Sequence, residues 1–494
     1  MQVVGARALG SPPARARQRA ARSWQPARAR VRPTMTVASA PNLDHTRLRD
    51  LCGGAVLIAG DDGYDPARRP WNLAVSQKPA AVAYPGDAEE VAALVRCARE
   101  AGLRIAVQST GHHAGAVEGP LEDAILVRTS ALRGVTVDPQ RRVARVGAGA
   151  LWQDVVEATR PHGLSALHGS APDVGVAGYT LGGGMGWLAR RHGLQCNHLL
   201  AAELVTADGD IVRTDAQTDP DLFWAIRGGG GSFGVVTALE IALLPLEMLY
   251  AGVLAWDAAH AETVLARWSE WAAEAPDEAT TSARLVRLPW LSRLPETLRG
   301  RRLVTIDGAI LGDDARAEEL LRDLRALKPE IDSFGQRSAA TLLRRIGDLD
   351  RAAPIVSDHV VLDTLDGDAT GALVEAAGSD PGLRTIELRQ LGGALGRPAP
   401  GAGALDALDG AAVLYMAGTA ENDARRTAVE EQLAHIRTAV ASWTAPKTLL
   451  NFAEGPADPR DAFNAPTFRR LCAVRKRVDP DGVFAAGHAI PSAA

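Results

Sequence analysis

The sequence predicts an α+β fold divided into more than one domain. The chain has 494 residues, which is too long for one ordinary domain and sufficient for two or three. Short apolar strands alternate with amphipathic helices between residues 79 and 245. After Pro245 the strands are accompanied by long helices, which is the pattern of an antiparallel sheet covered by helices.

Residues 1–43 differ in composition from the rest of the chain. Arginine recurs throughout this segment, and Asp44 is the first acidic residue of the sequence. The segment has no apolar centre of the kind found in a secretory signal peptide. It is either a basic targeting arm or a disordered leader, with Met35 as the true start, and we favour the leader.

The region from residue 44 to 246 begins its regular structure at Pro79. A helix is predicted over 87–102, because acidic residues occupy its first turn and apolar residues recur at spacings of three and four from Val91 to Ala98. The same reasoning predicts strands at 80–85, 104–109, 123–129 and 141–150 and a helix at 151–163. A hairpin is predicted over 201–215, with its turn at Asp208 and Gly209. Residues 220–245 are predicted to form a helix, a glycine run and a strand.

The region from residue 247 to 446 is predicted to be a separate α+β unit. Its elements are strands at 302–312, 383–396 and 411–420 and helices at 314–327 and 420–445. From Lys447 the pattern changes again, and a helical segment at 465–484 ends the chain. We treat 447–494 as a third segment.

The overall composition excludes several classes of partner. The net charge of −5 and the pI of about 6.2 argue against nucleic acid and anionic membranes. Four scattered cysteines without CxxC spacing fit a reducing compartment and exclude a thiolate zinc site. No run of eighteen apolar residues is present. We expect a cytoplasmic monomer or homodimer without a metal.

Three glycine clusters lie at 111–115, 170–193 and 227–236, each next to a predicted strand end. Glycine lets backbone N–H groups converge on an anion without obstruction by side chains. Residues 184–189 and 229–234 match the glycine pattern of dinucleotide folds, but the context is wrong for each. The second match precedes its strand, and the acidic residue at the expected distance from the first, Glu203, opens the next strand instead of closing it. We therefore reject that fold and keep the role in holding phosphate. No GxSxG motif supports a hydrolase.

The first cluster contains adjacent histidines, His112 and His113, which allow several interpretations. They could form a turn, a metal site, a general base or an attachment point. A zinc pair is disfavoured, because adjacent residues in an extended segment point in opposite directions and no third ligand is evident.

Four motifs in order resemble the berberine-bridge-enzyme-like flavoprotein oxidases of the vanillyl-alcohol-oxidase superfamily. They are "VAYPGDAEEVAALVRCAREAGLRIAVQSTGHHAG", "APDVGVAGYTLGGGMGWLARRHGL", "DLFWAIRGGGGSFGVVT" and the C-terminal "NF" followed by "FRRLCAVRKRVDPDGVF". The resemblance runs from about Arg68 to the C-terminus. It implies a two-subdomain PCMH-type FAD-binding domain with an inserted antiparallel sheet that carries the substrate site.

The resemblance also implies the roles of particular residues. His112 occupies the family's flavin-linking position, where an imidazole nitrogen bonds to the 8α carbon and makes the flavin more oxidising. The backbone from Ser109 to His113 would hold the pyrophosphate. The residues implied to contact FAD are Ser109, Thr110, Gly111, His112, His113, Asp173, Val174, Gly178, Gly182, Gly183, Gly186, Val236 and Asn451.

This chain departs from the family pattern at two positions. Many members attach FAD a second time through a cysteine, and Ala171 stands there, so at most one covalent bond is expected. Many members use a tyrosine as base where Leu449 stands, so deprotonation must come from elsewhere or be unnecessary. Tyr415 is our first candidate for a replacement base, against the alternative of sheet packing. Glu387 and Arg389 share a strand face that is solvated, ion-paired or in contact with substrate.

We therefore expect an FAD-dependent oxidoreductase that takes a hydride from a small organic substrate, such as a natural product, onto a flavin linked to His112, with oxygen as the electron acceptor. A dehydrogenase that uses another acceptor is the first alternative. A non-catalytic flavoprotein that sequesters a small aromatic compound is the second, and the missing tyrosine motivates it.

Overall fold

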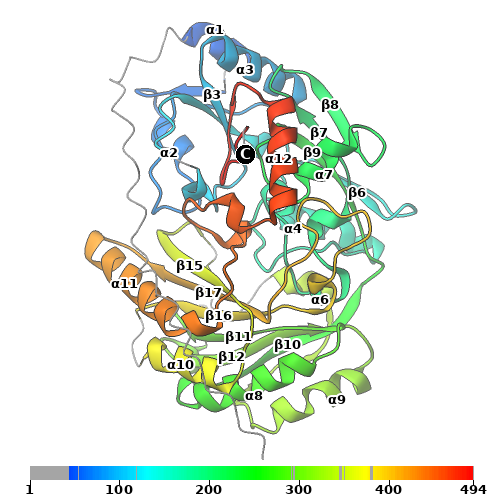
Figure 1. Ribbon diagram of the computed structural model, residues 1–494, viewed down its shortest axis with the longest axis vertical. Helices are drawn as coiled ribbons and strands as arrows, with labels where there is room; N and C mark the ends of the chain where they lie inside the picture. The colour runs from blue at the N-terminus through cyan, green and yellow to red at the C-terminus, as the bar shows by residue number, and fades with distance from the viewer. Residues whose placement is uncertain are drawn as a thin grey trace, which may run out of the picture. The chain divides into compact units, whose positions relative to one another are not determined.

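The computed structural model describes residues 44–492 except 54, 118, 291, 293–294, 344–347, 350 and 379–381. The leader predicted at residues 1–43 lies outside the described residues. Three β-sheets and their flanking helices make up the described chain (Figure 1), which confirms the α+β class. Within this part of the chain, no helix is both long enough and apolar enough to cross a membrane.

The first sheet is a mixed, five-stranded sheet in the order β1-β2-β4-β3-β18. Its last four strands run parallel to one another, and β1 is antiparallel to β2. The strand bounds are β1 Val56–Ile58, β2 Ala81–Ala83, β3 Arg104–Gln108, β4 Ala124–Arg128 and β18 Phe484–Ala485. Helices α1 (His45–Asp50), α2 (Tyr64–Arg68) and α3 (Ala88–Glu100) accompany them. Strand β18, near the C-terminus, therefore lies beside β3.

Helix α3 shows why these elements could be predicted. The Asp87 side chain caps it by accepting a hydrogen bond from the Glu90 N–H at 2.9 Å. Its Val91, Leu94 and Val95 are fully buried in the core that this sheet shares with β7. The helix predicted over 87–102 is thus confirmed, with ends shifted by one or two residues.

The second sheet is antiparallel and has the order β5-β6-β9-β7-β8. The predicted hairpin is confirmed: β7 pairs with β8, and Gly209 in the turn adopts φ +81°, which favours glycine. The bounds are β5 Val135–Asp138, β6 Val143–Gly147, β7 Leu199–Val205, β8 Ile211–Asp215 and β9 Val235–Ala242, with helices α4 Trp152–Thr159, α5 Val176–Leu181, α6 Ala189–His192, α7 Pro220–Ile226 and α12 Ala465–Val478.

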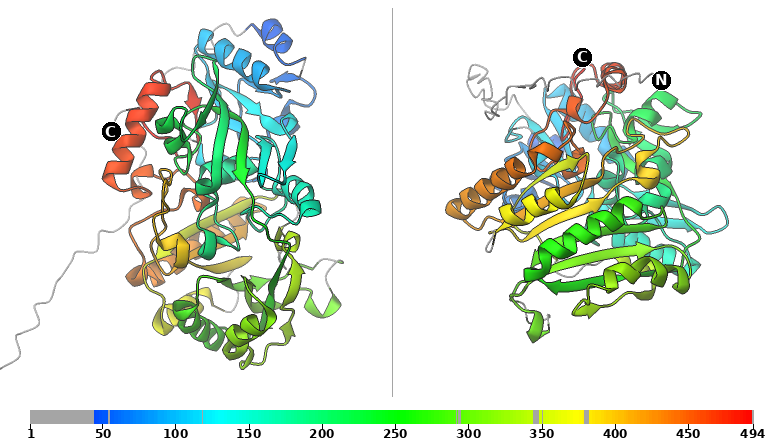
Figure 2. Two further views of the ribbon diagram at one scale, coloured as in Figure 1. Left: turned by 90° about the vertical axis from the view of Figure 1, so that its right-hand side faces the viewer. Right: turned by 60° about the horizontal axis from the view of Figure 1, so that its bottom comes forward.

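The third sheet is antiparallel, with the order β13-β10-β12-β11-β16-β17-β15 and β14 beside β10. Its helices lie along one face, as Figure 2 shows. The bounds are β10 Met248–Asp257, β11 Ala279–Arg287, β12 Arg302–Ile310, β13 Ile331–Asp332, β14 Gly335–Ser338, β15 Ile355–Leu362, β16 Thr385–Gln390 and β17 Ala412–Thr419, with α8 Ala261–Glu274, α9 Asp314–Arg325, α10 Gly367–Ala377 and α11 Asp423–Ala439.

The two faces of the third sheet differ in polarity. Along β16, Ile386 and Leu388 are buried in the core against the helices, whereas Thr385, Glu387 and Arg389 point to the other side. The predicted shared face of Glu387 and Arg389 is confirmed as ion-paired rather than solvated, since the Glu387 side chain is 1% exposed.

The sequence did not reveal β10, β11, β15, α8 or α10. In β11 the side chains of Thr280, Thr281, Ser282 and Arg284 are all buried. Because buried polar residues point to both faces of β11, this strand lacks the apolar-polar alternation by which a half-buried strand is identified. These buried polar residues therefore explain why β11 was missed.

Candidate functional site

A cavity of about 530 Å³ lies between the glycine loops of the first two sheets and the polar face of the third. The loop after β3, the start of α5, residues 228–231 and residues 484–488 form one wall, and β11, β16 and β17 form the other. The predicted site residues that line it are Ser109, Thr110, Gly111, His112, His113, Asp173, Val174, Gly178, Gly182, Val236, Tyr415 and Asn451.

Two predicted contact residues, Gly183 and Gly186, do not line this cavity. A Cβ at Gly186 would lie 2.1 Å from the His168 carbonyl oxygen, and one at Gly183 would lie 2.8 Å from Leu405 Cδ2. Both positions need glycine because other parts of the chain pack closely against them. These close contacts give both glycines a packing role, and their contact with a cofactor stays a prediction.

His112 is held by three neighbours at the cavity wall. Trp71 stacks on its ring with centroids 4.2 Å apart, and Thr110 Oγ1 hydrogen-bonds to Nδ1 at 2.7 Å. Asp173 Oδ1 lies 4.0 Å from Nε2, and Asp173 Oδ2 accepts a hydrogen bond from Trp71 Nε1–H at 2.7 Å. Burial lowers the pKa of His112 to about 4 although Asp173 opposes the shift. At neutral pH the imidazole is therefore uncharged, with a free lone pair.

His113 has a different environment from its neighbour. Its ring meets His488 edge-on, with centroids 6.0 Å apart, and burial lowers its pKa to about 3. The histidines thus contact different partners, and the described residues contain no group of three His, Cys, Asp or Glu that could hold a metal ion. This arrangement supports rejection of the zinc interpretation.

The glycine-rich wall has room for a ligand. A Cβ added at Gly178 or Gly230 would meet no heavy atom within 4 Å, so both residues leave open space on the cavity side. The Tyr179 side chain is also part of this wall, but its hydroxyl is buried on the side of Gly186 without a hydrogen-bond partner, and burial raises its pKa. Exposed glycine backbone fits a large polar cofactor.

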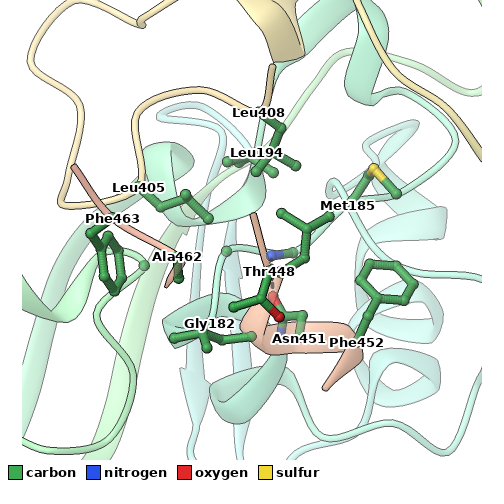
Figure 3. Close-up of a pocket in the computed structure, with 15 residues that line it drawn as sticks. Gly182, Met185, Leu194, Leu405, Leu408, Thr448, Asn451, Phe452, Ala462 and Phe463 are labelled. Atoms are coloured by element: carbon green, nitrogen blue, oxygen red, sulfur yellow. Dashed lines mark hydrogen bonds between the residues drawn. The ribbon is translucent and has the colours of Figure 1, made fainter. Parts of the chain in front are cut away.

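Asn451 is held against this wall by the short 3-10 helix Leu450–Phe452. Its Oδ1 accepts a hydrogen bond from the Gly184 N–H at 2.9 Å, and its amide packs on Gly182. Figure 3 shows Asn451 beside Gly182, where both residues line a small apolar pocket together with Leu405. The C-terminal segment therefore fixes the second glycine cluster in place.

The opposite wall carries a row of polar side chains across three strands. Arg284 of β11 pairs in register with Glu387 of β16, which pairs in register with Tyr415 of β17. Arg284 makes two hydrogen bonds to Asp307, at 2.8 and 2.9 Å, and Glu387 is paired with Arg389 at 2.9 Å. Paired charges at the cavity surface can bind polar groups of a substrate without leaving an isolated charge in the protein.

Tyr415 faces the cavity, as the functional interpretation requires. Its ring lies edge-on to Phe452, with centroids 5.9 Å apart. Burial raises its pKa to about 12, and the nearby Glu454 carboxylate adds to the shift. At neutral pH Tyr415 is therefore a phenol, and it can accept a proton only if it passes its own proton on.

His359 lies near Leu449 and is held there by hydrogen bonds. Its Nε2 accepts a hydrogen bond from the Leu449 N–H at 3.0 Å and lies 3.2 Å from Thr448 Oγ1. These bonds give His359 a structural role.

We predict that His359 makes the protein less stable in acid. Burial lowers its pKa to about 4, against about 6.5 in an unfolded chain, so between these values only the unfolded chain takes up the proton. Stability should fall as the pH drops through this window, by roughly 1 kcal/mol per pH unit. His359→Gln should remove that part of the slope in urea unfolding measured across the window. Equal slopes in both proteins would contradict the prediction.

Several residues of the site were not predicted. Trp71 and Asn72 lie in a segment without a recognisable pattern, and Arg284 lies on a strand that was missed. Gly228 to Gly231 belong to a glycine cluster that was identified but not assigned to individual contacts. Of these residues, only the glycines belong to a pattern that was recognised in the sequence.

Comparisons with known proteins agree with the geometry of the site. Residues 79–215 match the family described as "FAD binding domain". The (R)-6-hydroxynicotine oxidase of Paenarthrobacter nicotinovorans is 37% identical over 205 residues, which cover 41% of this chain and 44% of that protein. The glucooligosaccharide oxidase of Sarocladium strictum is 36% identical over 180 residues, which cover 36% of each. The matched segments span less than half the length of either relative.

Solved structures extend the similarity to most of the chain. The crystal structure of 6-hydroxy-D-nicotine oxidase from Arthrobacter nicotinovorans superposes with a TM-score of 0.78 at 25% identity and covers 89% of this chain and 98% of that one. The berberine bridge enzyme from Eschscholzia californica gives a TM-score of 0.76 at 20% identity, over 90% and 99% of the two chains. The second similarity shows that the two proteins share a fold.

Proposed function

We propose that this chain is a berberine-bridge-enzyme-like FAD-linked oxidoreductase that oxidises a small organic substrate in the cavity, with FAD tethered through His112 and oxygen as the electron acceptor. The observation that carries the proposal is one cavity whose two walls have different chemistry. One wall offers glycine backbone and a neutral His112, and the other offers paired polar side chains. FAD supplies hydride acceptance when bound, and the protein supplies position, electrostatics and proton transfer.

The residues present fit FAD. Attachment requires an unprotonated ring nitrogen, and burial keeps His112 in that state at neutral pH. The stacked Trp71 and the Thr110 hydroxyl limit the rotation of the ring. Ala171 at the cavity wall has no nucleophilic atom, so we propose a single tether. Residues 44–246 and 447–494 would hold FAD, and 247–446 would hold substrate.

The polar wall favours a substrate with hydrogen-bonding groups. Arg284, Glu387 and Arg389 occur as paired charges, so a neutral polar compound would meet both donors and acceptors without an unbalanced charge. Hydroxylated or amine-bearing compounds fit this description. The compounds in the names of the two oxidases above, 6-hydroxynicotine and a glucooligosaccharide, are of these kinds.

Anaerobic reduction of the bound flavin tests the proposal. We would mix the purified yellow protein with (R)-6-hydroxynicotine, a glucooligosaccharide or a hydroquinone and follow flavin absorbance. We expect at least one compound to bleach it, and air to restore the colour with release of hydrogen peroxide. Recovery only with an electron-accepting dye would indicate a dehydrogenase. Tight binding of the compounds without any bleaching would indicate sequestration and would contradict catalysis.

A further inference from the structure

We propose that Glu454 is the final proton acceptor of the reaction, connected to the substrate through the hydroxyl groups of Tyr415 and Ser357. The proposal rests on the proposed function, because it concerns the proton that a substrate hydroxyl or amine loses as it is oxidised. It assigns a role to a residue that lies three positions beyond Asn451, in the segment that closes the cavity.

The first support is a continuous set of contacts from the cavity to Glu454. Tyr415 lines the cavity, and the Ser357 side chain on the neighbouring strand β15 lies near its phenol, where it opposes the rise in the pKa of Tyr415. Ser357 Oγ donates to Glu454 Oε2 at 3.4 Å. This bond is long, as catalytic hydrogen bonds often are before substrate binds. Three side chains from separate segments thus form one path.

The second support is the rigid placement of the Glu454 carboxylate. Its Oε1 accepts a hydrogen bond from Asn72 Nδ2 at 2.5 Å. Asn72 is 1% exposed, and its Oδ1 accepts hydrogen bonds from the Ile355 and Ala74 N–H groups, each at 3.0 Å. Asn72 therefore joins β15 to Glu454 and holds the carboxylate in line with Ser357.

The third support is the charge around Glu454. The other carboxylates at the cavity wall have charged or aromatic N–H neighbours: Glu387 has Arg389, Asp348 has Arg284, and Asp173 has Trp71 Nε1. Within the described part of the chain, the hydrogen bonds of the Glu454 carboxylate come from a neutral amide and a neutral hydroxyl. Burial consequently raises its pKa above the ordinary glutamate range. A carboxylate with a raised pKa is a stronger base at neutral pH.

Other titratable groups near this path do not compete with Glu454. Arg389 and Glu387 face Tyr415 from β16 and are paired with each other. His488 hydrogen-bonds to Ala453 and Ala457 on either side of Glu454, and burial lowers its pKa, so it is neutral. Leu449 cannot accept a proton. Glu454 is thus the suitable acceptor beside Tyr415.

The relay moves one proton and no electrons. The O–H or N–H bond of the substrate breaks as a new O–H bond forms at Tyr415. The phenol proton of Tyr415 passes to Ser357 Oγ, and the hydroxyl proton of Ser357 passes to Glu454 Oε2. Tyr415 and Ser357 end unchanged, and Glu454 ends as the neutral acid. The electron pair of the substrate C–H bond leaves separately as the hydride that the proposed function assigns to FAD.

Glu454→Gln tests the relay, since glutamine keeps the shape and the bond from Asn72 but cannot take the proton. We would measure the rate of anaerobic flavin reduction against pH, with the panel compound that reduces the wild-type protein fastest. In the wild type the rate should rise with pH as Glu454 ionises. In Glu454→Gln this acid limb should vanish, and the neutral-pH rate should fall about 100-fold. Ser357→Ala should reproduce the loss of rate, and Glu454→Asp should restore part of it.

Glu430→Gln is the matched control, because it makes the same change on the exposed surface of α11. It should keep the wild-type rate and acid limb, which would show that the assay reports the proposed function. A Glu454→Gln rate within threefold of this control, or a retained limb, would overturn the relay alone. If no compound reduced even the wild-type flavin, the proposed function would fail instead.

A second measurement follows the Glu454 carboxyl without any substrate. Infrared difference spectra collected across a pH titration should show a carboxylic acid C=O band that is absent from Glu454→Gln. Its midpoint should lie above the ordinary glutamate range of about 4.3. A band that titrates within that range would contradict the role of Glu454, whatever the outcome for the proposed function.

Discussion

His112→Ala is expected to move the yellow colour from the protein precipitate to the supernatant after acid denaturation. In the wild type the colour should remain with the pellet, because a covalent bond to the imidazole survives unfolding. The expected change is from complete retention to complete release, since Ala171 leaves no second attachment point at the cavity wall. Absorbance of both fractions, together with the mass of the intact protein, measures it.

His113→Gln separates the tether from the general importance of the loop. His113 is the next residue, is also buried, and contacts His488 rather than Trp71. The flavin of the His113→Gln variant should remain in the pellet. Colour that left the wild-type pellet, or that stayed with His112→Ala but left with His113→Gln, would show that the attachment was assigned wrongly.

This loop illustrates what the sequence could predict. His112 was identifiable because its surroundings are local: the preceding strand, the flanking glycines and Thr110 all lie within a few residues. Asn451 was identifiable because a short motif marks it. Chain segments whose chemistry depends on immediate neighbours can be recognised without knowledge of the fold.

The residues that were missed depend on long-range contacts. Trp71 reaches Asp173 across about a hundred residues of sequence, and Asn72 reaches Glu454 across nearly four hundred. The sequence around each of these residues does not indicate its distant partner. Arg284 was hidden for a second reason, because its buried polar strand lacks the alternation that identifies strands. Tertiary packing alone brings these groups together.

Arg284→Met is expected to destabilise the protein by about 3–5 kcal/mol. The side chains of Arg284 and Asp307 are 1% and 7% exposed, and they share two hydrogen bonds. Methionine has a similar length but no charge, so Asp307 would keep only the bond from the Thr305 hydroxyl at 2.9 Å. A carboxylate buried without its cation is costly, because the protein interior does not replace the lost hydration. Urea unfolding followed by tryptophan fluorescence measures the loss.

Arg460→Met provides the comparison that isolates burial. Arg460 pairs with Asp458 by the same carboxylate–guanidinium chemistry, but the two side chains are 71% and 39% exposed. Water screens that pair, so its loss should cost far less than the loss of the buried pair. Similar losses in Arg284→Met and Arg460→Met would contradict the argument from burial.

The double variant Arg284→Met with Asp307→Leu separates the cost of an unpaired charge from the cost of losing an interaction. Removal of Arg284 and Asp307 together leaves no uncompensated charge between β11 and β12. Asp348 also loses Arg284, but its side chain is 28% exposed and can be hydrated, so most of the lost stability should return. The same variant would turn part of the polar cavity wall apolar, and it should therefore weaken binding of polar substrates while the fold is retained. Stability that stayed as low as in the single variant would show that Arg284 holds the sheet together by more than its pairing with Asp307.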